Sequence, residues 1–231
     1  MTQAQRDVGV VIVAAGESTR TAGNELKQFR WIAGKPMLLH SLQTFMAHPN
    51  VVSCVCVIPR EFVANPPPWI FQCDVDRLLL SIGGRSRTES VRNGLEDLPN
   101  EASVVLIHDA ARPLVDASLI DRVVERARSG ACVIPALPVV DTIKEVDAEG
   151  RVQKTLDRSR LWRVQTPQGF PREIIERAHR EARAASVTAT DDAALCERLG
   201  VAVEIVQGSE RALKVTEEGD FERVEALFAA K

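Results

Sequence analysis

The chain has 231 residues, 45% of them hydrophobic and 26% charged, which is ordinary for a globular protein with a substantial core. Its net charge of −3 excludes a broad basic surface of the kind that binds nucleic acid or anionic membranes. No apolar run approaches the ~20 residues of a membrane span, no secretory signal opens the sequence, and the cysteines lack metal-ligand spacing. We expect a cytoplasmic protein with reduced thiols.

Strand-like and helical segments alternate along the first part of the chain. Continuous β-branched runs occupy residues 8–13, 51–58, 78–82, 104–108 and 131–136. Between them, residues 37–47, 89–98 and 118–127 carry apolar side chains at helical spacing. Parallel strands need crossovers that cover both faces of the sheet, so the alternation predicts a Rossmann-like three-layer α/β fold with a mostly parallel sheet.

The first apolar run ends in a polar, basic loop of the kind that binds phosphate. Ala14-Ala15-Gly16 follows the run, and two cations, Arg20 and Lys27, come next. The spacing of the glycines excludes both the Walker loop and the dinucleotide fingerprint. Two fixed cations at the carboxyl end of a strand suit a triphosphate, although solvated surface charges would give the same pattern.

Two further polar segments follow predicted strands. Gly83-Gly84 opens a loop that leads into a helix containing Ser90, and this pattern fits either a base-binding loop or a simple helix cap at Ser86 or Thr88. In the run 108–113, Asp109 stands at a strand end with two alanines beside it. A carboxylate in that position is suited to a ribose hydroxyl or a hydrated magnesium ion.

The pattern changes after the fifth strand-like run. Segments 139–146 and 152–157 are polar and strand-like, and they flank Asp147-Ala148-Glu149-Gly150, which has good turn chemistry. A hairpin with so few large apolar residues is marginal alone. We therefore expect an arm at residues 138–160 that packs against a second subunit, with a hairpin lying on its own domain as the alternative.

The remaining residues return to mixed α/β character within a single domain spanning 1–231. Helices are expected at 171–185, 191–199 and 220–230, with a strand at 202–207. Thr190 has the chemistry of an N-cap, and Lys214-Val215-Thr216 is expected to end a strand.

Taken in order, these motifs resemble the 2-C-methyl-D-erythritol 4-phosphate cytidylyltransferase family, from about Val8 to Phe228. Each motif is weak alone, and the ordered set is specific. The set consists of Ala14-Ala15-Gly16 with Arg20 and Lys27, Gly83-Gly84 with Ser90, His108 to Pro113, Asp141-Thr142, Asp157-Arg158, Thr166-Pro167-Gln168, Thr190-Asp191, and Lys214-Val215-Thr216.

The resemblance implies transfer of CMP from CTP to methylerythritol phosphate, with Mg²⁺ or another divalent cation and with release of pyrophosphate. It implies a homodimer whose arm lends residues to the partner's site. The implied catalytic residues are Arg20, Lys27 and Lys214. The implied nucleotide-binding residues are Ala14, Ala15, Gly16, Gly83, Gly84, Ser90, Asp109 and Ala110, with Asp109 also near the metal. The implied acceptor-binding residues are Arg112, Thr142, Arg158, Thr166, Thr190 and Lys214.

Three positions depart from the pattern of the resembled family. Ser18 stands where a second glycine is usual, Leu26 where a proline is usual, and Arg85 where an acidic residue is common. Two alternative functions stay open from the sequence. One is a ribitol 5-phosphate cytidylyltransferase, because residue types alone do not separate two short polyol phosphates. The other is a nucleotide-binding regulator without catalytic activity.

Overall fold

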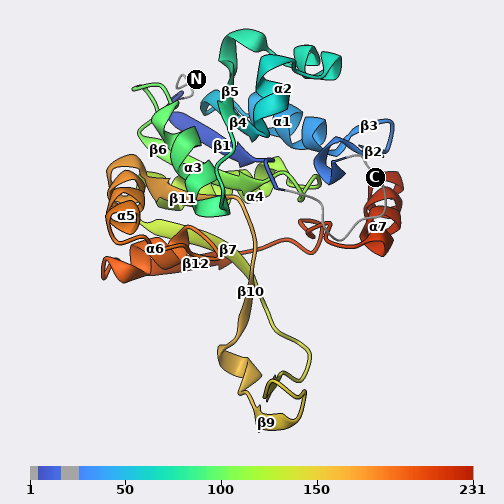
Figure 1. Ribbon diagram of the computed structural model, residues 1–231, viewed down its shortest axis with the longest axis vertical. Coiled ribbons are helices and arrows are strands. Elements are labelled where there is room, and N and C mark those ends of the chain that lie inside the picture. The colour runs from blue at the N-terminus through green and yellow to red at the C-terminus, as the bar shows by residue number, and fades with distance from the viewer. Residues whose placement is uncertain (1–4, 17–25, 231) are drawn as a thin grey trace.

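An eight-stranded sheet forms the centre of the protein in the computed structural model, which describes residues 5–16 and 26–230 (Figure 1). The strand order is β10-β7-β11-β6-β1-β4-β5, and β12 pairs with β7. The strands are β1 (Val8–Val13), β4 (Val51–Ile58), β5 (Leu78–Ile82), β6 (Val104–Asp109), β7 (Cys132–Pro138), β10 (Trp162–Val164), β11 (Gln168–Pro171) and β12 (Val203–Gln207).

The strand directions confirm a mostly parallel sheet. β1 pairs in parallel with β4 and β6, β4 with β5, and β7 with β12. β11 is antiparallel to both β6 and β7, and β10 is antiparallel to β7. These two strands were not among the predicted ones, because segments of three and four residues are too short to show a hydrophobic period.

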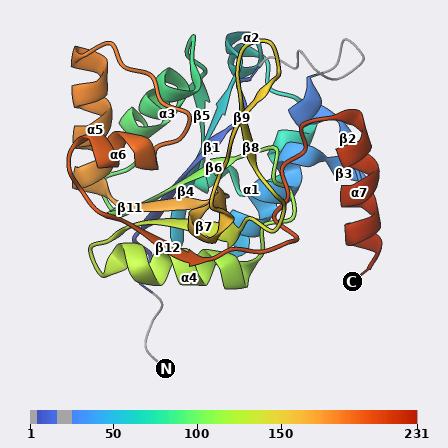
Figure 2. The same cartoon turned by 90° about the horizontal axis from the view of Figure 1, so that it is seen from below.

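Helices cover both faces of the sheet, which gives the predicted three layers (Figure 2). One buried cluster joins α1 and α4 to one face, and a second joins α3, α5 and α6 to the other. The helices of these layers are α1 (Met37–Ala47), α3 (Arg87–Glu96), α4 (Ala117–Arg128), α5 (Arg172–Ala184) and α6 (Ala193–Arg198). A shorter helix, α2 (Arg60–Ala64), follows β4.

Helix α3 approaches the sheet unusually closely. A Cβ atom on Gly94 would lie 2.6 Å from Cγ1 of Val11 and 2.8 Å from Cγ2 of Val57. Ser86 caps the helix, since its hydroxyl oxygen accepts a hydrogen bond from the Glu89 amide at 3.1 Å. The glycine-rich loop before α3 therefore supplies the N-cap of the helix, and the close packing of α3 on the sheet fixes the position of this loop.

The last described helix packs against a small hairpin beside α1. Helix α7 (Glu218–Ala229) begins with a capping box and buries apolar side chains against Ile32 of strand β2 (Trp31–Ile32), which pairs with β3 (Lys35–Pro36). No helix in the described ranges is long and apolar enough to cross a membrane.

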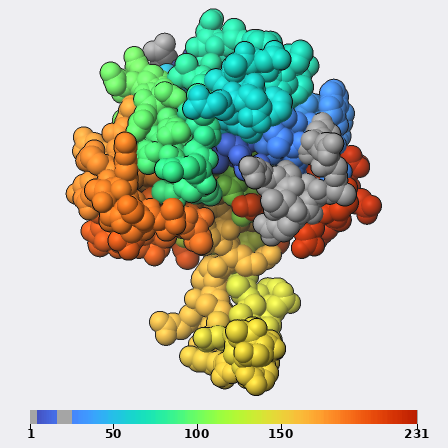
Figure 3. Space-filling view, in the orientation of Figure 1, coloured from blue at the N-terminus to red at the C-terminus, as the bar shows by residue number. Residues whose placement is uncertain are grey.

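The hairpin predicted at residues 138–160 stands away from the body of the protein (Figures 1 and 3). Its paired strands are β8 (Lys144–Val146) and β9 (Val152–Thr155), which are shorter than expected. All residues of both strands are exposed, including Val146 and Val152. The arm thus projects as predicted, and nothing in the described part of its own chain covers it.

Two local predictions were wrong. Thr190 is not the N-cap of α6, because Asp192 occupies that position and the carboxylate of Asp191 accepts the Ala194 amide at 3.0 Å. Lys214 does not end a strand, because β12 stops at Gln207 and residues 213–216 lie in the connection to α7.

Candidate active site

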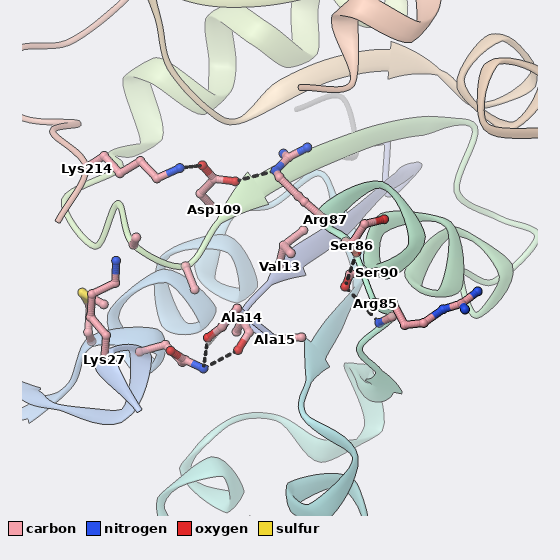
Figure 4. A pocket seen from close by; sticks show the side chains of 16 residues that line it. Val13, Ala14, Ala15, Lys27, Arg85, Ser86, Arg87, Ser90, Asp109 and Lys214 are labelled. Carbon is pink, nitrogen blue, oxygen red and sulfur yellow. Dashed lines mark hydrogen bonds and ion pairs between the residues drawn. The ribbon is translucent and has the colours of Figure 1, made fainter. Parts of the chain in front are cut away.

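A cavity of about 520 Å³ opens where β1 and β6 end and where β5 leads into α3 (Figure 4). Ligands of open α/β sheets bind at this edge, outside the carboxyl ends of the strands. The cavity is lined by nine residues that the sequence predicted for the site: Ala14, Ala15, Gly16, Lys27, Gly84, Ser90, Asp109, Ala110 and Lys214. Segments far apart in the sequence are therefore brought to one place.

The first loop is held by a residue that the sequence analysis missed. Gln28 is buried, and its amide nitrogen donates to the carbonyl of Ala14 at 2.6 Å and to that of Gly16 at 3.5 Å. Next to it, the ammonium group of Lys27 donates to the carbonyl of Val215 at 2.9 Å. Lys27 thus links the first loop to the segment that carries Lys214. Arg20 and Ser18 lie outside the described residues.

The glycine pair lets the second loop lie close to the first. A Cβ on Gly83 would come within 2.2 Å of the Ala15 Cβ, so only glycine fits there. The hydroxyl of buried Ser90 accepts from the Gly84 amide at 3.0 Å and donates to the Ser86 carbonyl at 2.9 Å. Ser90 therefore fixes the shape of the loop whose backbone lines the cavity.

Asp109 is the carboxylate at the centre of the site. Lys214 Nζ lies 2.7 Å from its Oδ2, and Arg87 Nε lies 3.2 Å from its Oδ1. Burial opposes its ionisation, but Arg87 and Lys214 outweigh that effect and hold the pKa of the carboxyl well below its usual range. Asp109 is consequently charged at neutral pH.

Thr166 forms hydrogen bonds with the backbone of Asp109 and with the ring of His108. The Thr166 hydroxyl accepts from the Asp109 amide at 3.1 Å and lies 3.0 Å from His108 Nδ1. His108 Nε2 faces the Arg112 carbonyl at 3.2 Å, which requires the proton on Nε2 and leaves Nδ1 as the acceptor. Burial is the main reason why the pKa of His108 falls to about 3, so the ring is neutral and structural.

This pKa predicts how His108 affects stability. The pKa lies near 6.5 in an unfolded chain and at about 3 in the folded one, so the unfolded chain binds more protons between these values. Stability is then lost as the pH falls from about 6.5, by up to ~1.4 kcal/mol per pH unit. In urea titrations between pH 7 and 4.5, His108→Gln should lose stability less steeply than the wild type. Equal slopes would contradict the assignment.

The other predicted acceptor-binding residues do not line this cavity in the described structure. The guanidinium of Arg112 donates to the carbonyls of Ala212 at 2.7 Å and Val164 at 3.2 Å. Thr190 is exposed in the bend before α6, and Thr142 and Arg158 are exposed on the arm. The fold thus places Thr142 and Arg158 away from the cavity of their own chain.

A second residue that the sequence analysis missed is Arg87, the first residue of α3, which also lines the cavity. It stands in the glycine-rich segment that drew attention for Gly83, Gly84 and Ser90. Its signal was a basic residue at the start of a helix, where the helix dipole disfavours positive charge. Such a residue needs carboxylate partners, and the structure supplies them.

The donor set around Asp109 is compatible with a magnesium ion that arrives with its ligand. No cluster of three or more histidine, cysteine or acidic side chains that could hold a metal is found in the described ranges. Mg²⁺ commonly binds through one or two carboxylates together with substrate phosphates and water. A single carboxylate in a cavity that also holds Lys27 and Lys214 fits that mode.

Comparison with known proteins decides the family. The family model for 2-C-methyl-D-erythritol 4-phosphate cytidylyltransferase matches residues 8–230. The chain belongs to this family. Membership makes it a nucleotidyltransferase and confirms the resemblance seen in the ordered motifs; the ribitol phosphate alternative is not favoured.

Relatives of the cytidylyltransferase family match nearly the whole chain. The 2-C-methyl-D-erythritol 4-phosphate cytidylyltransferase of Syntrophus aciditrophicus is 37% identical over 96% of this chain and 95% of its own length. The bifunctional enzyme IspD/IspF of Rhodospirillum rubrum is 44% identical over 96% of this chain and 57% of its own. The crystal structure of the Thermus thermophilus cytidylyltransferase has a TM-score of 0.81 at 32% identity and covers 96% of this chain and 98% of that chain.

Two of the three departures from the family pattern lie in described residues. Leu26 has φ −61° and ψ 126°, which are the angles a proline would adopt, so the backbone keeps a proline-like course. The Arg85 side chain is exposed, and its amide and guanidinium both contact Glu89, at 2.8 and 3.5 Å. Neither substitution closes the cavity.

Proposed function

We propose that this chain transfers the cytidylyl group of CTP to 2-C-methyl-D-erythritol 4-phosphate, forming 4-diphosphocytidyl-2-C-methyl-D-erythritol and pyrophosphate. The observation that carries the proposal is the cavity at the strand ends, in which Lys27, Lys214 and Asp109 converge within a chain of this family. Both substrates are anionic, and the described side chains that line the cavity include four cations and one carboxylate.

The reaction is an in-line displacement at phosphorus. An oxygen of the acceptor's phosphate attacks the α-phosphorus of CTP and forms the new P–O bond. The bond from the α-phosphorus to the bridging oxygen breaks, and pyrophosphate leaves with that electron pair. The protein contributes mainly by positioning two anions and by neutralising the charge that develops between them.

Each part of the site has a role in this proposal. Lys27 neutralises charge on the triphosphate, and Lys214, held by Asp109, orients the acceptor phosphate. The backbone of Gly84, fixed by Ser90, faces the base. Asp109 would hold Mg²⁺, which, when bound, supplies positive charge to the phosphate oxygens.

We further propose that the enzyme is a cytoplasmic homodimer joined through the arm. The exposed apolar side chains Val140, Val146 and Val152 support a partner surface, because a two-stranded hairpin is marginal without one. Thr142 and Arg158 would then enter the partner's cavity. All five cysteines are unpaired, which supports a reducing compartment.

A substrate panel tests the proposed reaction. Purified protein with Mg²⁺ is incubated with each of four nucleoside triphosphates and with methylerythritol phosphate, ribitol 5-phosphate or glycerol phosphate, and pyrophosphate release is measured. We expect turnover with CTP and methylerythritol phosphate at a kcat/KM at least tenfold above that of every other pair. Binding of CTP without pyrophosphate release from any pair would instead support a regulator without catalytic activity.

A further inference from the structure

A partly buried ion pair joins the nucleotide loop to the segment that carries Thr190. Arg87 follows the loop of Gly83 and Gly84, while Asp192 lies 105 residues later, at the start of α6. Arg87 Nη1 donates to Asp192 Oδ2 at 2.7 Å, and only 1% of the Asp192 side chain is exposed. The pair thus bridges two helices on the same face of the sheet.

Asp192 is fixed by two further elements. His179 on α5 is 2% exposed, and its Nε2 lies 3.1 Å from Asp192 Oδ1. Gln168 on β11 is fully buried, and its amide oxygen accepts from the backbone amides of Asp192 at 3.1 Å and Ala193 at 3.2 Å. Because these elements hold Oδ1 and the backbone of Asp192, the position of its other oxygen, Oδ2, determines that of the Arg87 guanidinium.

Arg87 also contacts Asp109, so the position of Asp192 affects the cavity. The Arg87 Nε contacts Asp109 at 3.2 Å, while Lys214 contacts the other oxygen of Asp109 at 2.7 Å from the opposite side (Figure 4). Charges of alternating sign therefore run from Asp192 through Arg87 and Asp109 to Lys214. The loop before Arg87 lies on the proposed nucleotide side, and Thr190 and Lys214 lie on the proposed acceptor side.

We propose that Arg87 and Asp192 are positioning residues that couple the two substrate sites, so that the acceptor binds well only while this ion pair holds Asp109 and the Thr190 segment against the nucleotide loop. The proposal rests on the proposed function. Without Asp192, the Arg87 guanidinium keeps only its contact with Asp109 within the described part of the chain, and without Arg87, Oδ2 of Asp192 loses its cationic partner, so the remaining side chain shifts. The loss falls mainly on the acceptor, because Ser86 and Ser90 still hold the nucleotide loop and Lys214 still pairs with Asp109.

A double-mutant cycle tests the coupling. For Arg87→Gln and for Asp192→Asn, we expect KM for methylerythritol phosphate to rise roughly tenfold or more, while the Kd of CTP, titrated alone with Mg²⁺, changes less than about threefold. The double variant should resemble the single variants, because the two side chains act as a unit. Multiplicative effects on KM, or equal losses for both ligands, would overturn the proposal.

A matched control separates positioning from stability. Asp7→Asn breaks another largely buried pair, in which Arg128 Nε lies 3.1 Å from Asp7. Asp7 precedes β1, at the opposite end of that strand from the cavity. This substitution should lower Tm about as much as Asp192→Asn and leave acceptor KM unchanged. If the Arg87 and Asp192 variants, like this control, lower Tm and leave the acceptor KM unchanged, the coupling alone is refuted. A wild type that binds CTP but never releases pyrophosphate refutes the proposed function instead.

Hydrogen exchange gives a readout that does not depend on turnover. In the wild type, CTP should slow exchange of the Asp192 and Ala193 amides, which donate to Gln168, because order at the nucleotide loop is transmitted through Arg87. In Arg87→Gln this CTP-dependent slowing should disappear. Slowing that persists in the variant, or that is absent from the wild type, would overturn the coupling whatever the enzyme's activity.

Discussion

Replacing Lys27 with methionine is expected to lower kcat by about 10²-fold to 10³-fold, the usual cost of removing one preorganised group that stabilises developing charge. Lys27 lines the cavity between the first loop and the Lys214 segment. Loss of the hydrogen bond from its ammonium group to the Val215 carbonyl should lower the free energy of unfolding by about 1.5–3 kcal/mol. Steady-state kinetics with CTP and methylerythritol phosphate, together with urea denaturation, measure the two effects.

Lys35 provides the control for this substitution. It lies eight residues further on, its ammonium group donates to Gln43 at 2.6 Å, and it does not line the cavity at the strand ends. Lys35→Met removes the same charge and should leave kcat within about twofold of the wild type. If both variants lost activity equally, net charge rather than a placed cation would explain the effect, and the role of Lys27 would be wrong.

Mixing two inactive variants is expected to restore activity if the arm completes the partner's site. Lys27→Gln damages the cavity, and Arg158→Gln damages the arm. Random exchange makes half of the dimers hybrids, and each hybrid has one site with both residues intact, so about a quarter of the wild-type activity should return. Pyrophosphate release is measured after subunit exchange, with capture of a tagged subunit to quantify the hybrids.

A second mixture controls for effects of mixing. Lys27→Gln combined with the double variant Lys27→Gln, Arg158→Gln contains no intact site in any pairing, so it should stay inactive. Recovery there would reveal contamination or an unrelated activation. If hybrids of the two single variants form but stay inactive, each site is built within one chain, and the arm has another role.

The sequence predicted the layers of this fold well because its parallel strands are long, buried runs. Strands β1, β4 and β5 and helix α1 begin and end where the periodicity indicated. The antiparallel strands β10 and β11 escaped prediction because their places are set by pairing with β6 and β7 rather than by their own composition. Tertiary pairing of this kind leaves no local signal.

The lining of the cavity was predictable where residues stand in the family's motifs and less so where they lie outside them. Lys27, Asp109 and Lys214 stood in recognisable motifs, and the structure brings them together at one cavity. Gln28 and Arg87 were missed because their roles depend on partners distant in sequence. An isolated glutamine in a sequence looks like any surface residue, and a basic residue at a helix start is only a weak signal until its partners are seen.

The contact of Gly94 with the sheet determines the distance between helix α3 and the strands beneath it. Since α3 rests directly on Val11 and Val57, the volumes of these two valines, and not the length of the loop, set how far Arg87 stands above the sheet. One added methylene group at Val11 in β1 or Val57 in β4 would push helix α3 away from the sheet. It would thereby lengthen the hydrogen bond from Arg87 to Asp109. The tolerance of catalysis to core substitutions should therefore be narrowest under α3, at side chains that no substrate touches.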